Sequence, residues 1–301
     1  MTLSELIADT ERQLTQAGVA FGHGTTNAHD EAAWLVLHAL GLPLDTDIEE
    51  FKPNQPLTPD RQARAATLLK ARIDSRQPLA YLTHEAWLQG VSFYVDERAI
   101  VPRSLIAEAI ADGSIDPWLS DRTHKVLDLC TGNGSLAVLA AMAWPEVQVD
   151  AADLSPDALA VARINVERHA LQDRITLIES DGLAQCPGPY DLILCNPPYV
   201  DAGSMAALPA EFRAEPALAL AGGADGMDFI RTLLRDAPAC MSEHAVLVLE
   251  IGHERAHFEA AFPQLNPVWF DTSAGSDQVL LLTQADLVHP TSPTEAPTST
   301  P

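Results

Sequence analysis

Residues 125–153 read KVLDLCTGNGSLAVLAAMAWPEVQVDAAD, and this stretch decides the fold. It begins as a strand-like run ending at Cys130, turns through Gly132-Asn133-Gly134, continues as an apolar helix-like run and closes on a second strand-like run. Two strands separated by a helix predict parallel neighbours, because a parallel pair needs a crossover connection. The stretch therefore predicts one βαβ unit of a sheet that is wound on both faces.

The same alternation continues toward the C-terminus. Further strand-like runs are ITLIES (175–180), YDLILC (190–195), AVLVLEIG (245–252), VWF (268–270) and QVLLLT (278–283). The last two have no clear helix between them, so we expect them to form a hairpin. We predict a doubly wound α/β domain with a mostly parallel seven-stranded sheet over residues 104–287. The Pro/Thr/Ser-rich tail 288–301 is predicted to be disordered.

The N-terminal part has a helical pattern. Apolar residues recur at helical spacing in 3–19, a second helix-like run ends at Gly41, and Thr58 followed by Pro59 predicts the start of a third helix. We therefore predict a helical domain over residues 1–77. The aromatic and β-branched segment AWLQGVSFYVDERAIV then predicts a β-hairpin linker within 78–103.

Charge excludes one class of function. The 301 residues include 42 acidic and 18 basic side chains, a formal net charge of −24. A nonspecific nucleic-acid binder needs clustered Lys and Arg, whereas this field repels polyanions and attracts basic partners. We therefore expect a basic protein as the macromolecular partner and no direct nucleic-acid binding.

Composition indicates the compartment. Hydrophobic residues make up 47% of the chain, which allows a large core, but no apolar run approaches the roughly 20 residues that span a bilayer. The cysteines at 130, 186, 195 and 240 are widely separated and include no CxxC pair. We expect a soluble, unprocessed, cytoplasmic protein with buried reduced thiols and no membrane partner.

The loop that follows the first strand-like run is a candidate cofactor site. Its glycines allow a sharp turn and a close approach of the backbone to a ligand. Asp153 ends the next strand-like run, where a carboxylate can accept hydrogen bonds from both ribose hydroxyls of an adenosine-containing cofactor. Because residues 132–137 also satisfy G-x-G-x-x-A, NAD stays open as an alternative. Asp128 can contact the ligand or orient the loop, and Asp181 can accept from an adenine amino group or be a solvated turn residue.

Asn196-Pro197-Pro198-Tyr199 follows the strand-like run 190–195 and is the most specific motif. The two prolines fix φ and remove two backbone donors, which leaves a rigid segment with free carbonyl oxygens. The Asn196 side-chain oxygen and the Pro197 carbonyl offer two acceptors for one planar NH₂ group, and the Tyr199 ring can pack against its plane. Such a site can hold a nitrogen nucleophile in line with the sulfonium methyl of S-adenosylmethionine, which favours methyl transfer over hydride transfer.

These motifs resemble those of the HemK/Prm family of glutamine N5-methyltransferases, which are class I S-adenosylmethionine-dependent enzymes with a helical N-terminal domain. Residues 196–199 match the NPPY signature that binds the glutamine amide, so the resemblance implies that Asn196, Pro197 and Tyr199 are catalytic and that Pro198 joins them in binding substrate. It also implies that the cofactor is held by Asp128, Cys130, Thr131, Gly132, Asn133, Gly134, Asp153, Asp181 and Asn196. Residues 215–220 and 223–226 match the segment that follows NPPY in this family.

Within the family, residues 93–98 and 101–104 look like the branch that modifies large-subunit ribosomal protein L-three. The release-factor branch typically has Pro-Arg-Pro-Asp-Thr-Glu at the second segment, which this chain lacks, although Leu105 also departs from the proline expected after Ser104. The resemblance implies that the substrate is unassembled L-three, a basic protein, and that the helical domain recognises it. Methylation of release factors by the same chemistry is the nearest alternative.

Two further classes of function compete with this interpretation. Residues 253–257 match H-E-x-x-H, in which two histidines one helical turn apart bind zinc and Glu254 acts as general base. The motif directly follows a strand, so His253 falls at or before the first helical turn, and Glu259 is on the wrong face to join His257 as a ligand. Two surface histidines are therefore favoured, and we expect no metal. The third class is a noncatalytic binder that retains the fold.

Overall fold

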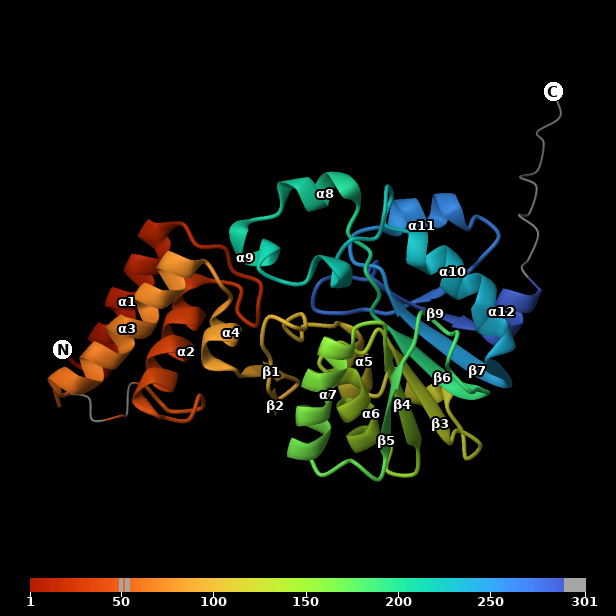
Figure 1. Ribbon diagram of the computed structural model, residues 1–301, viewed down its shortest axis with the longest axis horizontal. Coiled ribbons are helices and arrows are strands. Elements are labelled where there is room, and N and C mark those ends of the chain that lie inside the picture. The colour runs from red at the N-terminus through yellow and green to blue at the C-terminus, as the bar shows by residue number, and fades with distance from the viewer. Residues whose placement is uncertain (49–50, 52–54, 290–301) are drawn as a thin grey trace. The chain divides into compact units, whose positions relative to one another are not determined.

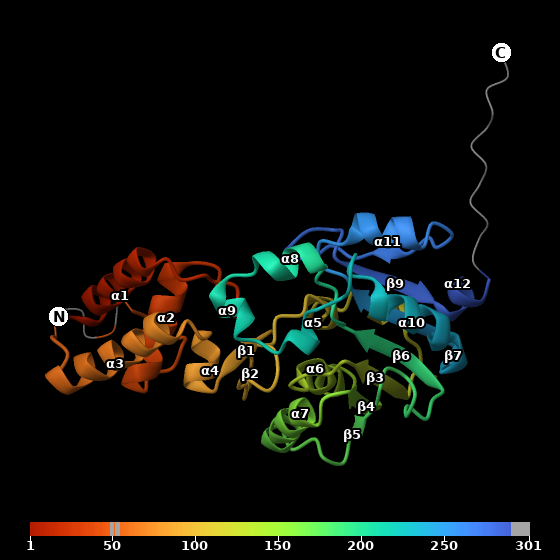
Figure 2. The same ribbon diagram turned by 45° about the horizontal axis from the view of Figure 1, so that its top comes forward.

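The computed structural model describes residues 1–48, 51 and 55–289. Contacts divide the chain into two compact units, drawn in Figures 1 and 2: a helical unit of residues 1–103 and 208–216, and a sheet unit of residues 104–207 and 217 onward. The sequence pattern places 208–216 in the predicted 104–287 domain. These residues belong instead to the helical unit, because two of their glutamates are buried among its basic side chains.

Local signals begin and end the main helices of the helical unit. Thr2 forms a capping box with Glu5, Thr58 accepts from the third residue of its helix, and Gly18 and Gly41 close two helices in the left-handed conformation. The three predicted helices are confirmed. The helices are α1 (Leu3–Ala17), α2 (Ala28–Leu40), α3 (Pro59–Ser75), α4 (Leu79–Thr83) and α9 (Ala210–Arg213).

The predicted hairpin is also present. Strand β1 (Ala86–Leu88) pairs antiparallel with β2 (Val91–Phe93). The connecting residues Gln89 and Gly90 have φ angles of 49° and 75°, and two positive φ values in a two-residue loop match the twist of the flanking strands. These residues therefore fold locally, inside the helical unit.

The sheet unit contains the predicted seven-stranded sheet, in the order β5-β4-β3-β6-β7-β9-β8. All neighbours are parallel except β9, which is antiparallel to both β7 and β8, and so the closing hairpin is confirmed. The strands are β3 (Lys125–Leu129), β4 (Gln148–Asp153), β5 (Ile175–Glu179), β6 (Tyr190–Cys195), β7 (Met241–Glu250), β8 (Val268–Trp269) and β9 (Val279–Thr283).

Helices cover both faces of this sheet, as the double winding requires. Figure 2 shows α6 and α7 on one side and α10 and α12 on the other. Apolar residues of α10 and α11 pack on one face of the strands in a single core. The helices and 3₁₀ turns of this unit are α5 (Ile106–Ala111), η1 (Asp116–Trp118), α6 (Ser135–Ala143), α7 (Pro156–Arg168), α8 (Ala202–Ala207), η2 (Ala217–Ala219), α10 (Asp228–Asp236), η3 (Ala237–Ala239), α11 (Arg255–Ala261) and α12 (Gln284–Val288).

The strand order reverses between β3 and β6, and this is where such sheets bind ligands. Leu129 is the register partner of Cys195, so the loops that follow these two strands start side by side at the carboxyl edge of the sheet. Both chemical motifs of the sequence are therefore brought to one place.

Three predictions concern the chain as a whole. In the described part of the chain, no helix has both the length and the apolarity needed to span a membrane. All four cysteines are free thiols, but only Cys186 and Cys195 are buried as predicted, whereas Cys130 and Cys240 are half-buried. The tail predicted to be disordered begins at Val288, which here closes α12, and the rest of it from residue 290 lies outside the described residues.

Candidate active site at the carboxyl edge of the sheet

Three residues of the loop between β3 and α6 have the left-handed conformation. Cys130, Gly132 and Gly134 have φ angles of 61°, 56° and 82°. A Cβ on Gly134 would lie 3.1 Å from Cβ of Ala162 on α7, so the loop lies close against that helix, whereas a Cβ on Gly132 would meet no atom within 4 Å. The glycines therefore let the loop pack tightly on one side and leave open space beside Gly132 on the other.

Asp128 lies buried at the base of this loop and has one oxygen without a partner. Its Oδ2 accepts from Oγ1 of Thr131 at 2.5 Å and from the backbone N of Ala137 at 2.9 Å, while Oδ1 is buried and has no hydrogen-bond donor. Burial raises the pKa of this carboxyl to about 7. A cationic ligand group would satisfy Oδ1, so the site fits a cofactor that carries an amino group.

Asp153 ends β4 and holds the loop as well as bordering it. Its Oδ2 accepts from the backbone N of Gly132 at 2.9 Å and its Oδ1 from the backbone N of Ser155 at 2.9 Å. Burial raises the pKa of the Asp153 carboxyl. Each carboxylate oxygen keeps a second lone pair, so both can still accept from a diol. Asp181 follows β5 at the same edge of the sheet and is exposed.

The remaining loop residues are fixed from within the sheet unit. The backbone oxygen of Asn133 accepts from Nδ2 of Asn165 at 2.8 Å, and its side-chain Oδ1 accepts from the backbone N of Ser135 at 3.3 Å. The thiol of Cys130 lies beside that of Cys195, and the hydrogen bond between them together with burial raises the Cys130 pKa well above its usual range. The thiol of this loop is therefore neutral.

The motif 196–199 leaves β6 directly. Pro197 is buried, while Asn196, Pro198 and Tyr199 are half-buried. The hydroxyl of Tyr199 donates to Oε1 of Glu250 at 3.1 Å. The motif therefore combines a buried rigid centre with flanking side chains that solvent or a ligand can reach.

Three glycines surround Tyr199. A Cβ on Gly222 would lie 2.7 Å from the Tyr199 backbone, a Cβ on Gly226 would lie 2.3 Å from its carbonyl oxygen, and a Cβ on Gly252 would lie 2.5 Å from its ring. Real Cβ atoms do not approach this closely, so each position excludes larger residues. Gly226 lies in the segment 223–226 that resembles the family, and here it packs against the motif.

Glu250 completes this arrangement, and sequence reasoning missed its role. It is the last residue of β7, and its side chain is buried. Its Oε2 accepts from Oγ of Ser104 at 2.6 Å and from the backbone N of Leu105 at 2.9 Å, while Oε1 accepts from Tyr199. Its partners are 51 to 146 residues away in the chain, and no local pattern signals such a contact.

The H-E-x-x-H segment does not form the geometry of a zinc site. His253 lies in a turn before α11, and Glu254 is the residue that precedes the helix. Nδ1 of His257 pairs with Oε2 of Glu254 at 2.6 Å, so the proposed base binds one of the proposed ligands. Throughout residues 1–48, 51 and 55–289, no three His, Cys, Asp or Glu side chains gather as a metal-binding group.

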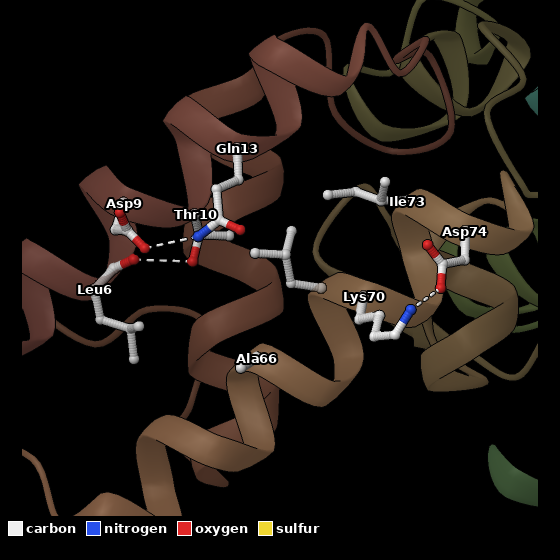
Figure 3. A pocket seen from close by; sticks show the side chains of 9 residues that line it. Leu6, Asp9, Thr10, Gln13, Ala66, Lys70, Ile73 and Asp74 are labelled. Carbon is white, nitrogen blue, oxygen red and sulfur yellow. Dashed lines mark hydrogen bonds and ion pairs between the residues drawn. The ribbon is translucent and has the colours of Figure 1, made fainter.

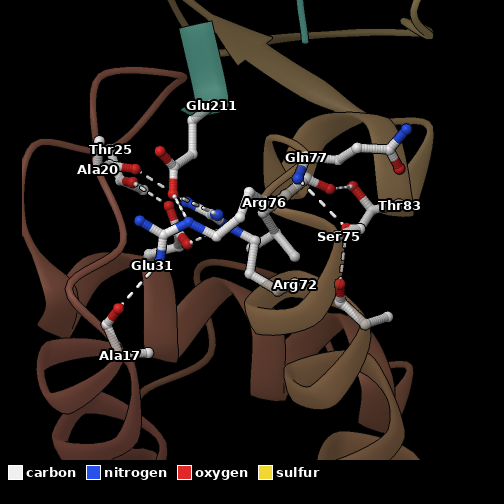
Figure 4. Close-up of polar contacts among 12 residues, drawn as sticks. Ala17, Ala20, Thr25, Glu31, Arg72, Ser75, Arg76, Gln77, Thr83 and Glu211 are labelled. Atoms are coloured by element: carbon white, nitrogen blue, oxygen red, sulfur yellow. Dashed lines mark hydrogen bonds and ion pairs between the residues drawn. The ribbon is translucent and has the colours of Figure 1, made fainter. Parts of the chain in front are cut away.

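The helical unit contains a buried charge cluster, shown in Figure 4. Arg72 is fully buried, pairs with Glu31 at 2.8 Å and Glu211 at 3.4 Å, and donates to the backbone oxygen of Ala20 at 2.9 Å. Arg76 pairs with Glu211 at 2.9 Å. Glu211 lies in the segment 208–216, so these pairs fix that segment in the helical unit.

A second buried glutamate fixes the same segment. Both oxygens of Glu215 accept from the guanidinium of Arg103, at 2.6 and 2.8 Å, and one also accepts from the backbone N of Val101 at 2.9 Å. Nε2 of His23 lies 3.4 Å from this carboxylate. Burial alone would raise the pKa of Glu215, but the charge of Arg103 and the hydrogen bonds hold it at about 2.

The helical unit also has a surface groove between α1 and α3 (Figure 3). It encloses about 310 Å³ and has an apolar floor that includes Leu69 and Ile73. Asp9 and Asp74 stand on its two sides, each hydrogen-bonded to a neighbour on its own helix.

Comparisons with known proteins agree with this architecture. A family model described as the methyltransferase small domain matches residues 116–223. The chain is 54% identical over 289 residues to the ribosomal protein uL3 glutamine methyltransferase of Bordetella pertussis, covering 95% of this chain and 96% of the relative. It is 50% identical over 296 residues to the protein of the same name from Burkholderia pseudomallei, covering 95% of each chain.

A solved structure shows the same fold at low sequence identity. The catalytic domain of hMettl16, in complex with hairpin 6 of the MAT2A 3′UTR, matches with a TM-score of 0.52 and 15% identity, over 74% of this chain and 80% of that one. Together with the strand order, this likeness shows the fold of class I S-adenosylmethionine-dependent methyltransferases.

Proposed function

The chain belongs to the family of ribosomal protein uL3 glutamine methyltransferases, and from this membership we propose that it transfers a methyl group from S-adenosylmethionine to the side-chain amide nitrogen of a glutamine in uL3, the protein L-three. The observation that carries the proposal is the register of β3 and β6, which starts the Asp128 loop and the 196–199 motif from neighbouring strand ends.

We assign cofactor binding to the loop and its flanking carboxylates. Asp128 would accept from the amino group of the cofactor through its free Oδ1, Asp153 would accept from the ribose hydroxyls, and the space beside Gly132 would admit the ligand. Asp181 would accept from the adenine amino group. When bound, S-adenosylmethionine supplies an electrophilic methyl group on a sulfonium.

We assign substrate binding to the 196–199 motif. Asn196 and Pro197 would accept the two N–H bonds of the glutamine amide through the Asn196 side-chain oxygen and the Pro197 carbonyl, which fixes the nitrogen in place. Those acceptors also stabilise positive charge as it develops on that nitrogen, because they are already oriented before the reaction. Tyr199 would pack against the amide plane, and no nucleophilic side chain is needed.

We propose that the partner is unassembled, basic uL3 and that the reaction takes place in the cytoplasm. A net charge of −24 supports steering toward a basic protein and disfavours direct binding of RNA or DNA. Four free thiols, two of them adjacent, support a reducing compartment.

The first test incubates the enzyme with methyl-labelled S-adenosylmethionine and either uL3 or a peptide-chain release factor. We expect label on a glutamine of uL3, and Asn196→Ala should abolish it because one of the two amide acceptors is lost. If only the release factor is labelled, the release factor and not uL3 is the substrate. If neither protein is labelled, the proposed reaction is contradicted.

The family resemblance implies that the helical unit recognises the substrate protein. We further propose that it does so in the groove between α1 and α3, because the apolar lining and the carboxylates of Asp9 and Asp74 there suit a basic partner. Ala66→Arg places a charged side chain in this groove, and Ala63→Arg places the same side chain on an exposed position of α3 outside it. We expect only Ala66→Arg to raise KM for uL3, with KM for S-adenosylmethionine unchanged in both. Equal effects of the two variants would exclude the groove as the binding face.

A further inference from the structure

Glu250 is held so that one oxygen faces Tyr199. Ser104 and the backbone N of Leu105 both donate to Oε2, at 2.6 and 2.9 Å, and this fixes the plane of the carboxylate. The remaining oxygen, Oε1, accepts the Tyr199 hydroxyl at 3.1 Å. Because the Glu250 side chain is buried, this hydrogen bond is shielded from water and is charge-assisted.

Contacts at two places therefore fix the position of the Tyr199 ring. Gly252, two residues after Glu250, leaves room for the ring, since a Cβ there would overlap it at 2.5 Å. Glu250 fixes the far end of the ring through the hydroxyl. Gly222 and Gly226 pack against the Tyr199 backbone. The whole residue thus sits in a socket formed by these four residues.

We propose that Glu250 is a positioning residue for methyl transfer, which acts by orienting the Tyr199 ring against the amide plane of the target glutamine. The proposal rests on the proposed function. A tyrosine that donates to a carboxylate also has a more electron-rich ring, and such a ring face favours a neighbouring nitrogen that becomes positive in the transition state. Loss of the Glu250 charge should therefore slow turnover more than it weakens binding.

The same sheet contains a matched control pair. The hydroxyl of Tyr190 donates to Oδ2 of Asp150 at 2.8 Å, and both residues are buried. Tyr190 is the first residue of β6, whereas the 196–199 motif follows its last residue. Tyr190→Phe therefore removes the same kind of hydrogen bond at the opposite edge of the sheet from the site.

The experiment is a double-mutant cycle with three readouts. Tyr199→Phe, Glu250→Gln and the double variant are compared for kcat on uL3, for KM of both substrates and for resistance to urea unfolding. We expect each single variant to lower kcat by roughly 10-fold, the typical loss for a charged hydrogen bond, with KM for S-adenosylmethionine within about twofold of wild type. The double variant should be no slower than the worse single variant, because both remove one interaction.

Tyr190→Phe separates positioning from stability. We expect it to lower the urea midpoint about as much as Tyr199→Phe and to leave kcat unchanged. In the unfolding cycle, Tyr199→Phe and Glu250→Gln should also be non-additive, which tests their contact without turnover.

Three outcomes would overturn the inference. The kcat losses of the two single variants could multiply in the double variant, Glu250→Gln could have wild-type kcat while Tyr199→Phe is slow, or Tyr190→Phe could slow turnover equally. A wild-type enzyme that labels no uL3 would instead overturn the proposed function, and this inference with it.

Discussion

Oδ1 of Asp128 is buried and has no hydrogen-bond donor, and we therefore predict that cofactor affinity depends on pH. With a pKa of about 7, this carboxyl is about 3% ionised at pH 5.5 and half ionised at pH 7. The α-amino group of the ligand, with a pKa of about 7.7–8.0, stays protonated over that range. If only the ionised carboxylate accepts from this amino group, affinity should rise about 15-fold from pH 5.5 to pH 7.

Asp128→Asn is the matching perturbation. The asparagine oxygen can keep the hydrogen bonds from Thr131 and Ala137, while its NH₂ group takes the place of the free Oδ1 and cannot accept. We expect this variant to bind weakly at every pH. Isothermal titration of S-adenosylhomocysteine at several pH values measures this, and titrations in buffers of different ionisation enthalpy measure the proton released by the wild type.

The stability of the cofactor-free protein should fall as pH rises, whereas cofactor affinity increases. The folded-state pKa lies above the ordinary value of 3.8, so the contribution of Asp128 to stability is complete below about pH 4 and is lost as pH rises through 7. This difference between the two pKa values corresponds to on the order of 4 kcal/mol of unfolding free energy. Without cofactor at pH 8.5, Asp128→Asn should therefore unfold at higher urea than wild type. Wild-type affinity that stays flat from pH 5.5 to pH 7, or an equal slope in Asp128→Asn, would refute this reasoning.

Three further predictions concern other parts of the chain. Gly252→Ala should lower kcat at least 10-fold, because the added Cβ displaces the Tyr199 ring. Gly90→Ala has the same left-handed strain but open space around the added Cβ, so it should lose only about 1–2 kcal/mol of stability. Equal losses of kcat in the two variants would contradict the socket around Tyr199. Arg72→Met should destabilise the helical unit by about 3–5 kcal/mol in urea unfolding, because Glu31 stays buried without its cation and Glu211 keeps only Arg76; a loss below 1 kcal/mol would contradict this. Glu215 has a depressed pKa, so its contribution of about 3 kcal/mol should be lost as pH falls from about 4.5 toward 2, and Glu215→Gln should flatten that acid profile.

The sheet and the ligand edge could be predicted from the sequence because their signals are local. The apolar run ending at Leu129, the glycines after it and the prolines at 197 and 198 each restrict the backbone within a few residues. Parallel pairing then follows from the helices between the strands, and it brings the loop and the motif to one edge. Which residues bind cofactor and substrate stays a prediction from resemblance and geometry.

The contacts around Tyr199 and the charge cluster of the helical unit could not be predicted in this way. Glu250 closes an ordinary buried strand, and its partner Ser104 lies 146 residues earlier, so only the completed fold joins them. Glu211 belongs to a short helical segment after the motif and has no apolar periodicity to indicate that it is buried. Its burial depends on Arg72, 139 residues earlier in the chain.

The discontinuous helical unit sets an order for biosynthesis. Val200 and Ala221 form a β-bridge at the two ends of a segment. The middle of this segment supplies Glu211 to Arg72 of α3 and Glu215 to Arg103, and both partners are made more than a hundred residues earlier. A nascent chain that stops at residue 103 holds Arg72 without one of its buried counter-ions, so the N-terminal helices cannot reach their final state until residue 216 has left the ribosome. An isolated N-terminal fragment would therefore need residues 208–216, supplied in cis or as a peptide, to fold fully.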